Sequence, residues 1–341
     1  MSVRRDTLAA VRPALRLGLL PLWRDRDTVQ IGIDPRRAIA ISGLSQAADV
    51  IRLLDGSRER DQLVAAARAH GVQPAVTERI MTLLAAAGVL VDFPSEVVRS
   101  LAPERRKQLL PVLATASLAA QDGDGGARVL ARRSSTAVLI CGSGLIAGIV
   151  ADLLTRSGVA ARSTPVLPVR ELAQPHRAGR PDLVVLVGHQ SPAETADLSR
   201  LRLPHLAVDA SEAIGVVGPL VLPGVTACLR CIDLAKAERD PAWPLILAQL
   251  AGHNVDPPAC DPVLATTVAA QAAGQVLAFA DQAPRAQVTA NGTLELVCPA
   301  WQWRRRSWLP HPACICGSAA KAHADRQQPR YDDEGTEGGP E

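Results

Sequence analysis

Aromatic residues and net charge are both scarce in this chain of 341 residues. Phe, Trp and Tyr make up 2% of the sequence, which leaves few side chains on which single-stranded nucleic acid could stack. The 37 basic residues nearly balance the 34 acidic ones, so the net charge of +3 is too small to favour nucleic acid as the main partner. We therefore expect a protein that binds something other than nucleic acid.

The sequence also has no apolar run long enough to cross a bilayer. The most apolar stretch, 137–150, is shorter than the ~20 residues that a membrane helix needs, and it contains glycines. Arg12 and Arg16 interrupt the apolar residues near the N-terminus before they could form the core of a secretory signal. Because the seven cysteines are an odd number and no such signal precedes them, we expect no disulfide framework, no membrane and a cytoplasmic location.

Four of the cysteines form two close pairs at the two ends of a long segment: Cys228 with Cys231, and Cys314 with Cys316. Two such pairs supply the tetrahedral all-sulfur set that zinc prefers, and four protein ligands leave no open position for a substrate. The sequence therefore predicts one structural zinc ion, the alternative being chance burial of cysteines. Because a single residue separates the second pair, His311 is kept as a reserve ligand.

A small winged-helix-like α+β module is predicted for residues 10–98. Strands at 28–33 and 38–41 flank a turn and form a hairpin. Pro74 and Gly88 bracket the last helix, at positions where helices commonly begin and end. The predicted helices cover 45–54, 58–70 and 74–87, and a short strand follows at 89–91. Such a module binds either nucleic acid or an extended peptide.

The rest of the chain is predicted to contain a linker at 99–133, a Rossmann-like domain at 134–317 and a disordered polar tail at 318–341. In the Rossmann-like domain, Gly142, Gly144 and Ala147 stand between a strand and a helix, where a nucleotide loop would bind phosphate. Further strands are predicted at 182–187, 206–209, 214–221 and 301–303, a helix at 262–281 and a hairpin turn at 291–292.

This order of motifs resembles the ThiF-type, ubiquitin-activating-enzyme-like superfamily. Members place a glycine loop first, a paired-cysteine zinc site on a later loop and the chain end, and an alanine-rich helix between the cysteine pairs. The segments 224–231 and 311–317 look most like the branch that accompanies the cyclodehydratases of bacteriocin and related modified-peptide pathways. In that branch a PqqD-like module comes first, and Leu53-Leu54-Asp55-Gly56 resembles it.

The resemblance implies a leader peptide that adds as a strand along 28–33 or 38–41 and packs against the helix at 74–87. The sequence also departs from the adenylating members of the superfamily at several positions. Adenylating members have G-x-G-G-x-G, whereas Leu145 and Ala147 stand at two of those positions here. The acidic residue expected after the second strand, and the Asn-Arg-Gln stretch after it, have no counterpart near 160–175. Gly188-His189-Gln190 stands where a magnesium-binding aspartate is expected, so ATP and magnesium are doubtful cofactors.

We therefore expect a pseudo-enzyme that binds a precursor peptide or partner protein and presents it to a separate, heterocycle-forming enzyme, with a homodimer left open. The alternative is an active ATP-dependent adenylating enzyme, and winged-helix DNA binding is opposed by the charge. Cys260 is either a loop thiol or a thioester-forming residue. Cys141 and Cys298 are expected to be structural, with Cys298 a zinc ligand only if Cys314 or Cys316 is not. Structural roles are also favoured for His189 and Asp209, the alternative being that they share the crevice at the carboxyl edge of the sheet.

Overall fold

The computed structural model describes residues 11–42, 47–121, 123–174, 179–189, 191–250 and 259–318. Contacts divide the chain into two compact units. The first consists of residues 1–135 with 156–158, and the second of 136–155 with 159–341. The predicted tail at 318–341 lies outside the described residues, apart from Ser318.

The first unit contains a small antiparallel sheet in the order β2-β3-β4, which is formed by Pro21–Trp23, Val29–Ile31 and Ile39–Ile41. The predicted hairpin is β3–β4. The expectation that the strand at 28–33 offers a free edge is wrong, because β2 pairs with the other side of β3. A separate ribbon joins β1 (Pro13–Leu15) to β5 (Leu90–Asp92).

Three helices pack against this sheet: α1 (Ala47–Leu53), α2 (Arg60–Ala69) and α3 (Pro74–Ala86). Their apolar positions recur at helical spacing, so one face of each helix is buried. Leu63, Ile80 and Leu84 are almost fully buried together with Val29 and Ile31 of β3. This core makes the first half of the unit a mixed α+β module.

The segment predicted as a linker, 99–133, is instead largely helical. After the short α4 (Glu96–Arg99), α5 spans Pro103–Ala120 and α6 spans Ala127–Ser135. The glycine and aspartate cluster forms the turn between α5 and α6, where Asp124 accepts hydrogen bonds from the backbone N–H groups of Gly126 and Arg128 at 2.9 and 3.1 Å. A Cβ at Gly126 would lie 2.7 Å from the carbonyl oxygen of Leu113, so glycine permits the two helices to pack closely.

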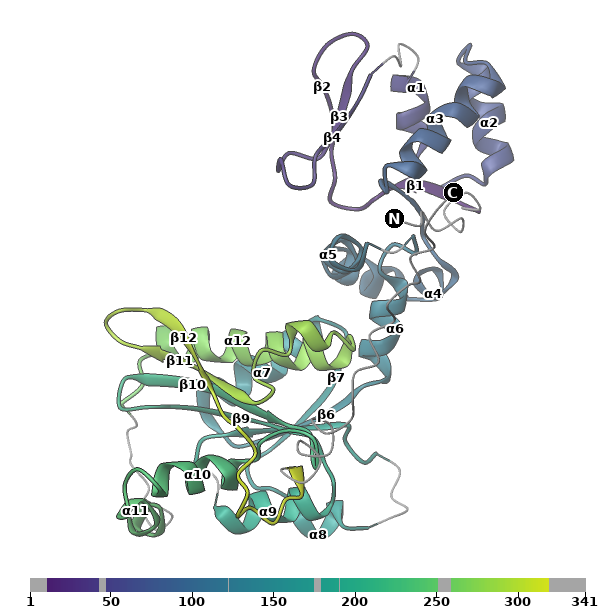
Figure 1. Ribbon diagram of the computed structural model, residues 1–341. Helices are drawn as coiled ribbons and strands as arrows, with labels where there is room; N and C mark the ends of the chain where they lie inside the picture. The colour runs from purple at the N-terminus through teal and green to yellow at the C-terminus, as the bar shows by residue number, and fades with distance from the viewer. Residues whose placement is uncertain are drawn as a thin grey trace, which may run out of the picture. The chain divides into compact units, whose positions relative to one another are not determined.

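In the described part of the second unit, seven strands form one mixed sheet in the order β12-β11-β10-β9-β8-β6-β7 (Figure 1). The strands β7, β6, β8 and β9 run parallel, and β9 to β12 pair antiparallel. Their bounds are Ala137–Cys141 (β6), Ala160–Thr164 (β7), Leu183–Val187 (β8), His205–Ser211 (β9), Ile214–Val221 (β10), Gly292–Val297 (β11) and Gln302–Ser307 (β12). The hairpin predicted at 291–292 turns instead at 298–301, because Gly292 is already paired in β11.

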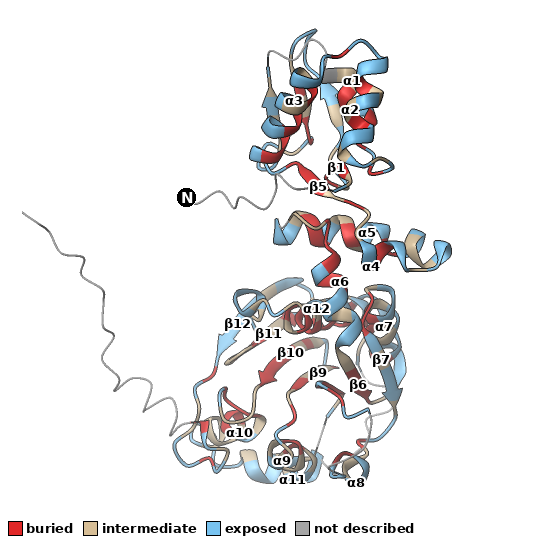
Figure 2. Cartoon of the chain, turned by 90° about the vertical axis from the view of Figure 1, so that its right-hand side faces the viewer, coloured by how far each residue is buried: buried red, intermediate tan, exposed pale blue. Residues whose placement is uncertain are grey.

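Helices cover both faces of this sheet. α7 (Gly144–Arg156) and α12 (Pro262–Ala280) lie on one face, and the opposite face carries α8 to α11 (Figure 1). The latter are Val169–Leu172 (α8), Pro192–Arg200 (α9), Leu229–Ala237 (α10) and Trp243–Leu250 (α11), and a 3-10 turn, Pro284–Ala286, follows α12. Two buried clusters fill the spaces between the sheet and its helices, as the burial pattern in Figure 2 shows. The second unit is thus a layered α/β structure.

The helix α12 is long and apolar enough to span a membrane, and it is the one such helix among the described residues. Within its most apolar window, 56% is buried inside the protein. The helix packs closely on β10, since a Cβ at Gly215 would lie 2.2 Å from the side chain of Val268. Its apolar composition is explained by its place in the core.

Candidate functional site

The four cysteines of the two predicted pairs lie together in one cluster. The Sγ atom of Cys228 is 3.7 Å from that of Cys231 and 3.6 Å from that of Cys314, and Cys231 and Cys316 are 3.6 Å apart. All four sulfurs lie within 4.8 Å of one another. Zn–S bonds of about 2.3 Å in a tetrahedron place neighbouring sulfurs about 3.8 Å apart. The spacing of the sulfurs therefore fits a zinc ion held by four thiolates.

The first pair is positioned by the end of β10 and the start of α10. Cys228 is the N-cap residue of α10, and Cys231 lies in its first turn. The turn before the helix is fixed by Thr226, whose hydroxyl accepts a hydrogen bond from the N–H of Leu222 at 2.8 Å and donates one to the carbonyl of Leu220 at 3.1 Å. These bonds hold the pair rigidly against the sheet.

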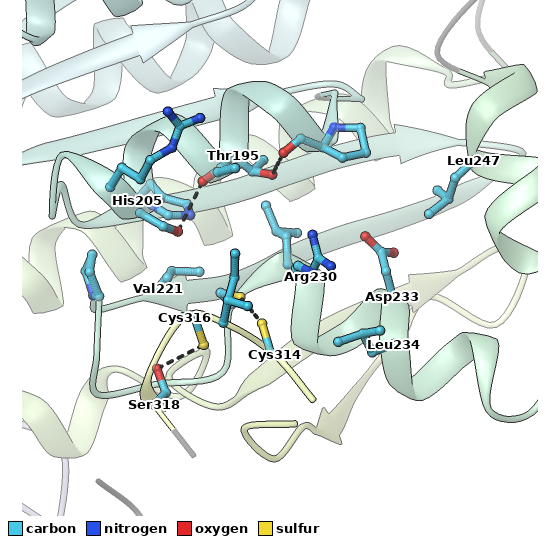
Figure 3. Close-up of a pocket in the computed structure, with 18 of the residues that line it drawn as sticks. Thr195, His205, Val221, Arg230, Asp233, Leu234, Leu247, Cys314, Cys316 and Ser318 are labelled. Carbon is cyan, nitrogen blue, oxygen red and sulfur yellow. Dashed lines mark hydrogen bonds between the residues drawn. The ribbon is translucent and has the colours of Figure 1, made fainter. Parts of the chain in front are cut away.

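The second pair comes from the segment 308–318, which returns from β12. Trp308 is buried, and its indole N–H donates to the hydroxyl of Thr293 at 3.0 Å. The Sγ atom of Cys316 lies 3.5 Å from the hydroxyl of Ser318 (Figure 3). Cys314 is buried with Cys228 and Cys231 in a small apolar cluster that includes Trp308. A metal here would join α10 to this returning segment.

Without a cation the clustered thiols compete for protons. The hydrogen bond from Cys228 lowers the pKa of the Cys231 thiol to about 4, and the same contact raises the pKa of Cys228. Burial raises the pKa of Cys314 to about 11. A zinc ion would stabilise all four thiolates and release the remaining protons, so its affinity should fall with falling pH.

The reserve ligand His311 lies outside the metal cluster. Its Nε2 atom is 2.8 Å from a carboxylate oxygen of Glu238, and its Nδ1 atom accepts a hydrogen bond from the N–H of Ala313 at 3.2 Å. Both ring nitrogens are therefore occupied. The hydrogen bonds of His311 fix the segment before Cys314, and the four cysteines complete the ligand set without it.

The other three cysteines lie elsewhere in the second unit. Cys141 is buried at the end of β6, and burial raises its pKa to about 12. Cys298 is partly buried against the core. Burial, with the nearby carboxylate of Asp261, raises the pKa of Cys260, and its thiol donates to the carbonyl of Asp261 at 3.7 Å. A raised pKa disfavours the thiolate that a thioester-forming cysteine needs.

The predicted nucleotide loop lies between β6 and α7. Gly142 has a φ of +130°, and a Cβ there would lie 2.5 Å from the carbonyl oxygen of Val187 in β8. Gly144 has a φ of +81° and opens α7, whereas Ala147 is buried in the core. Leu145 is 51% exposed in the first turn of α7, where phosphate would approach. Packing alone therefore explains Gly142 and Ala147.

The described residues that directly follow β6, β7 and β8 carry no carboxylate: they are 142–145, 165–168 and 188–189. The carboxylate of Asp233 in α10 lies close enough to His189 to interact electrostatically with it. Asp209, for which a structural role was favoured over a place in the crevice with His189, accepts a hydrogen bond from the hydroxyl of Ser211 at 2.9 Å.

A polar cluster on α10 and α11 was not predicted from the sequence. The indole N–H of Trp243 donates to Asp233 at 3.2 Å, and the Nζ atom of Lys236 lies 4.4 Å from the centre of the Trp243 ring. Burial raises the pKa of Asp233 and lowers that of Lys236. Asp233 and Lys236 follow Cys231 and are three residues apart. On a helix this spacing places them on the same face, and it is the sequence pattern from which the cluster could have been predicted.

No family model and no curated protein matches this chain. Its fold is similar to that of the heterocyclase TruD, with a TM-score of 0.63, 18% identity, and 92% of this chain and 44% of that one covered. A heterocyclase in complex with substrate and cofactor gives a TM-score of 0.64, 16% identity, and coverages of 92% and 40%. The chain thus spans less than half the length of these heterocyclases.

The fold is also similar to that of Escherichia coli MccB, solved with AMPCPP and MccA. The TM-score is 0.58 and the identity 13%, and the match covers 90% of this chain and 99% of MccB. Likeness at this level of identity shows a shared fold alone. In all three comparisons the shared fold covers most of this chain.

Proposed function

We propose that this chain is a ThiF-type, activating-enzyme-like protein of the cyclodehydratase-partner branch that binds a precursor peptide and presents it to a separate modifying enzyme. The fold shared with TruD and MccB supports the family. The observation that carries the non-adenylating role is the lack of carboxylates in the described residues that follow β6, β7 and β8. In this reading Gly142, Gly144 and Ala147 are the remnant of a nucleotide loop.

Adenylyl transfer depends almost entirely on the stabilisation of phosphate charge. Cations, a metal ion and oriented donors supply that stabilisation, and the metal ion needs carboxylate ligands. The loops 142–145, 165–168 and 188–189 offer backbone N–H groups and one imidazole, but no such ligand. A site of this composition favours an architectural role over catalysis.

The peptide-binding role rests on the edge strand β4. Among the described residues it pairs with β3 on one side only, so its other edge can accept an added strand. Ile39 and Ile41 pack toward the core of the module, and Ala40 is exposed between them. A peptide on this edge would gain backbone hydrogen bonds from β4 and apolar contacts from the module.

A matched pair of proline substitutions tests this site in the full-length chain. Ala40→Pro removes an N–H that points away from β3 at the free edge of β4, whereas Trp23→Pro removes one at the free edge of β2. Titration with leader peptides of precursors encoded beside this chain should show at least tenfold weaker binding for Ala40→Pro alone, with circular dichroism unchanged in both variants. Equal losses in the two variants, or none in either, would refute binding at β4.

The active adenylating enzyme remains the second candidate because of Asp233. This half-buried carboxylate lies near His189 at the end of β8 and could hold a cation there. An adenylating role would require it, so Asp233→Asn separates the two candidates in an assay of pyrophosphate exchange.

A further inference from the structure

A cavity of about 570 Å³ opens beside the cysteine cluster in the second unit. It is walled by α9, α10, α11 and the segment 314–318, and its lining is mostly apolar (Figure 3). Val221, Leu234 and Leu247 contribute to this lining. Small-molecule sites in proteins typically occupy about 300–1,000 Å³ and combine an apolar lining with a few polar groups. The cavity has the size and composition of such a site.

The charged side chains that line the cavity are mainly cationic. Arg200 forms an ion pair with Asp197 at 2.7 Å, and Asp233 accepts the hydrogen bond from Trp243. The guanidinium groups of Arg202 and Arg230, which both line the cavity, make no hydrogen bond or ion pair with any described residue. Arg202 lies over Gly224, where a Cβ would be 3.9 Å from its guanidinium. Two exposed cations at the cavity therefore have no partner among the described side chains and are available to an anion.

A buried histidine in the wall provides an independent observation. The Nδ1 atom of His205 lies 2.9 Å from the carbonyl oxygen of Leu203, which assigns the ring proton to Nδ1 and leaves Nε2 as an acceptor. Nε2 is buried and has no hydrogen-bond partner among the described residues. A buried acceptor without a donor is costly, so a hydroxyl or N–H elsewhere on a bound molecule would stabilise this wall, whereas a carboxylate only accepts hydrogen bonds and would be held by the arginines.

We propose that this cavity binds a small amphiphilic carboxylate, with its apolar chain between α10 and α11 and its carboxylate at Arg202 and Arg230. The apolar walls exclude a strongly hydrated ligand, because burying its polar groups without partners would be unfavourable. The two guanidiniums favour an anion and can bind a carboxylate through two parallel hydrogen bonds. The site is distinct from the peptide edge at β4 and from the glycine loop.

Calorimetric titration of the zinc-loaded full-length chain with decanoate, below its micelle concentration, tests the proposal. One saturable site is expected, with a dissociation constant on the order of 0.1 mM or tighter for an acid of this size. The double variant Arg202→Gln/Arg230→Gln should bind decanoate at least tenfold more weakly. It should bind decanol, the uncharged counterpart, as the unmodified chain does.

A second pair of variants tests the place of the apolar chain. Leu247→Trp fills the cavity from α11 and should weaken decanoate binding at least tenfold. Leu245 is 64% exposed on the same helix and does not line the cavity, so Leu245→Trp should change the affinity less than twofold.

Metal analysis must first show the same zinc content in every variant, so that a change in binding can be assigned to the cavity. Loss of decanoate binding in the double arginine variant and in Leu247→Trp, with Leu245→Trp unaffected, supports the proposal. Absence of a saturable site, equal binding by all variants, or equal loss of decanoate and decanol in the arginine variant would overturn it.

Discussion

The glycine loop and the cysteine cluster, both in the second unit, differ in how complete they are. At the glycine loop the backbone keeps its left-handed glycines, Gly142 and Gly144, but the neighbouring loops offer no carboxylate. At the cysteine cluster all four ligands are present, and their sulfurs are spaced as a metal requires. Residues that stabilise the fold, such as the four cysteines and Gly142, are thus present, whereas carboxylates that would serve only a reaction are missing from these loops.

Removing a metal ligand should give the largest effect. In Cys228→Ser the second unit should lose zinc, and its free energy of unfolding should fall by more than about 3 kcal/mol, because structural zinc contributes directly to folding. Metal analysis and thermal unfolding measure both quantities. Cys260→Ser, which lies outside the cluster, is the control and should keep about one zinc per chain. A stably folded chain that never contained metal would disprove the zinc site.

The free energy of unfolding should decrease in acid because His205 is buried in its neutral form. Burial lowers its pKa from 6.5 to about 4. The unfolded state therefore binds more protons than the folded state between these values, so the free energy of unfolding falls as pH drops from about 7 to about 4. The loss from this group is at most about 3 kcal/mol, at 1.36 kcal/mol per pKa unit.

The variant His205→Asn isolates this effect from acid release of zinc. Its amide can still donate to the carbonyl of Leu203 but does not titrate, so its stability should depend less steeply on pH than that of the unmodified chain. His70→Asn, at an exposed position in the first unit, controls for the substitution. Identical pH profiles for all three proteins would refute the role of His205.

The two glycines of the loop should differ in their contribution to stability. Gly142→Ala should destabilise the second unit by more than about 2 kcal/mol, because the new Cβ would meet the carbonyl oxygen of Val187. Gly144 has no atom within 4 Å of that position, so Gly144→Ala should cost only the strain of a positive φ, about 1–2 kcal/mol. Chemical denaturation measures both. A larger loss for Gly144→Ala would contradict the packing role assigned to Gly142.

Much of the fold followed from local patterns in the sequence. The strands β6, β8 and β10 are apolar runs, and α12 has a proline in its first turn and an apolar composition that marks a buried helix. The strand β2 was missed because it has only three residues and begins with Pro21. The helices α5 and α6 were missed because the glycine and aspartate turn between them has the composition of a flexible linker.

One of the candidate sites could likewise be predicted from a local sequence pattern, and the others could not. The cysteine cluster could be predicted because its spacing is a direct signature of metal chemistry, and the structure brings all four sulfurs together. The pairing of Trp243 with Asp233 and the cavity beside the cluster could not, since both depend on how α11 returns over α10. Contacts of this kind are set by tertiary packing, which no local pattern encodes.

The central claim is that the chain presents a peptide bound at β4 and does not adenylate it. The most direct test is ATP–pyrophosphate exchange by the zinc-loaded full-length chain, with magnesium and a leader-bearing precursor peptide at saturating concentration. We predict a rate equal to that without protein, because no carboxylate follows β6, β7 or β8 in the described residues. Exchange that requires the peptide and is abolished in Asp233→Asn would contradict the account and establish an adenylating enzyme.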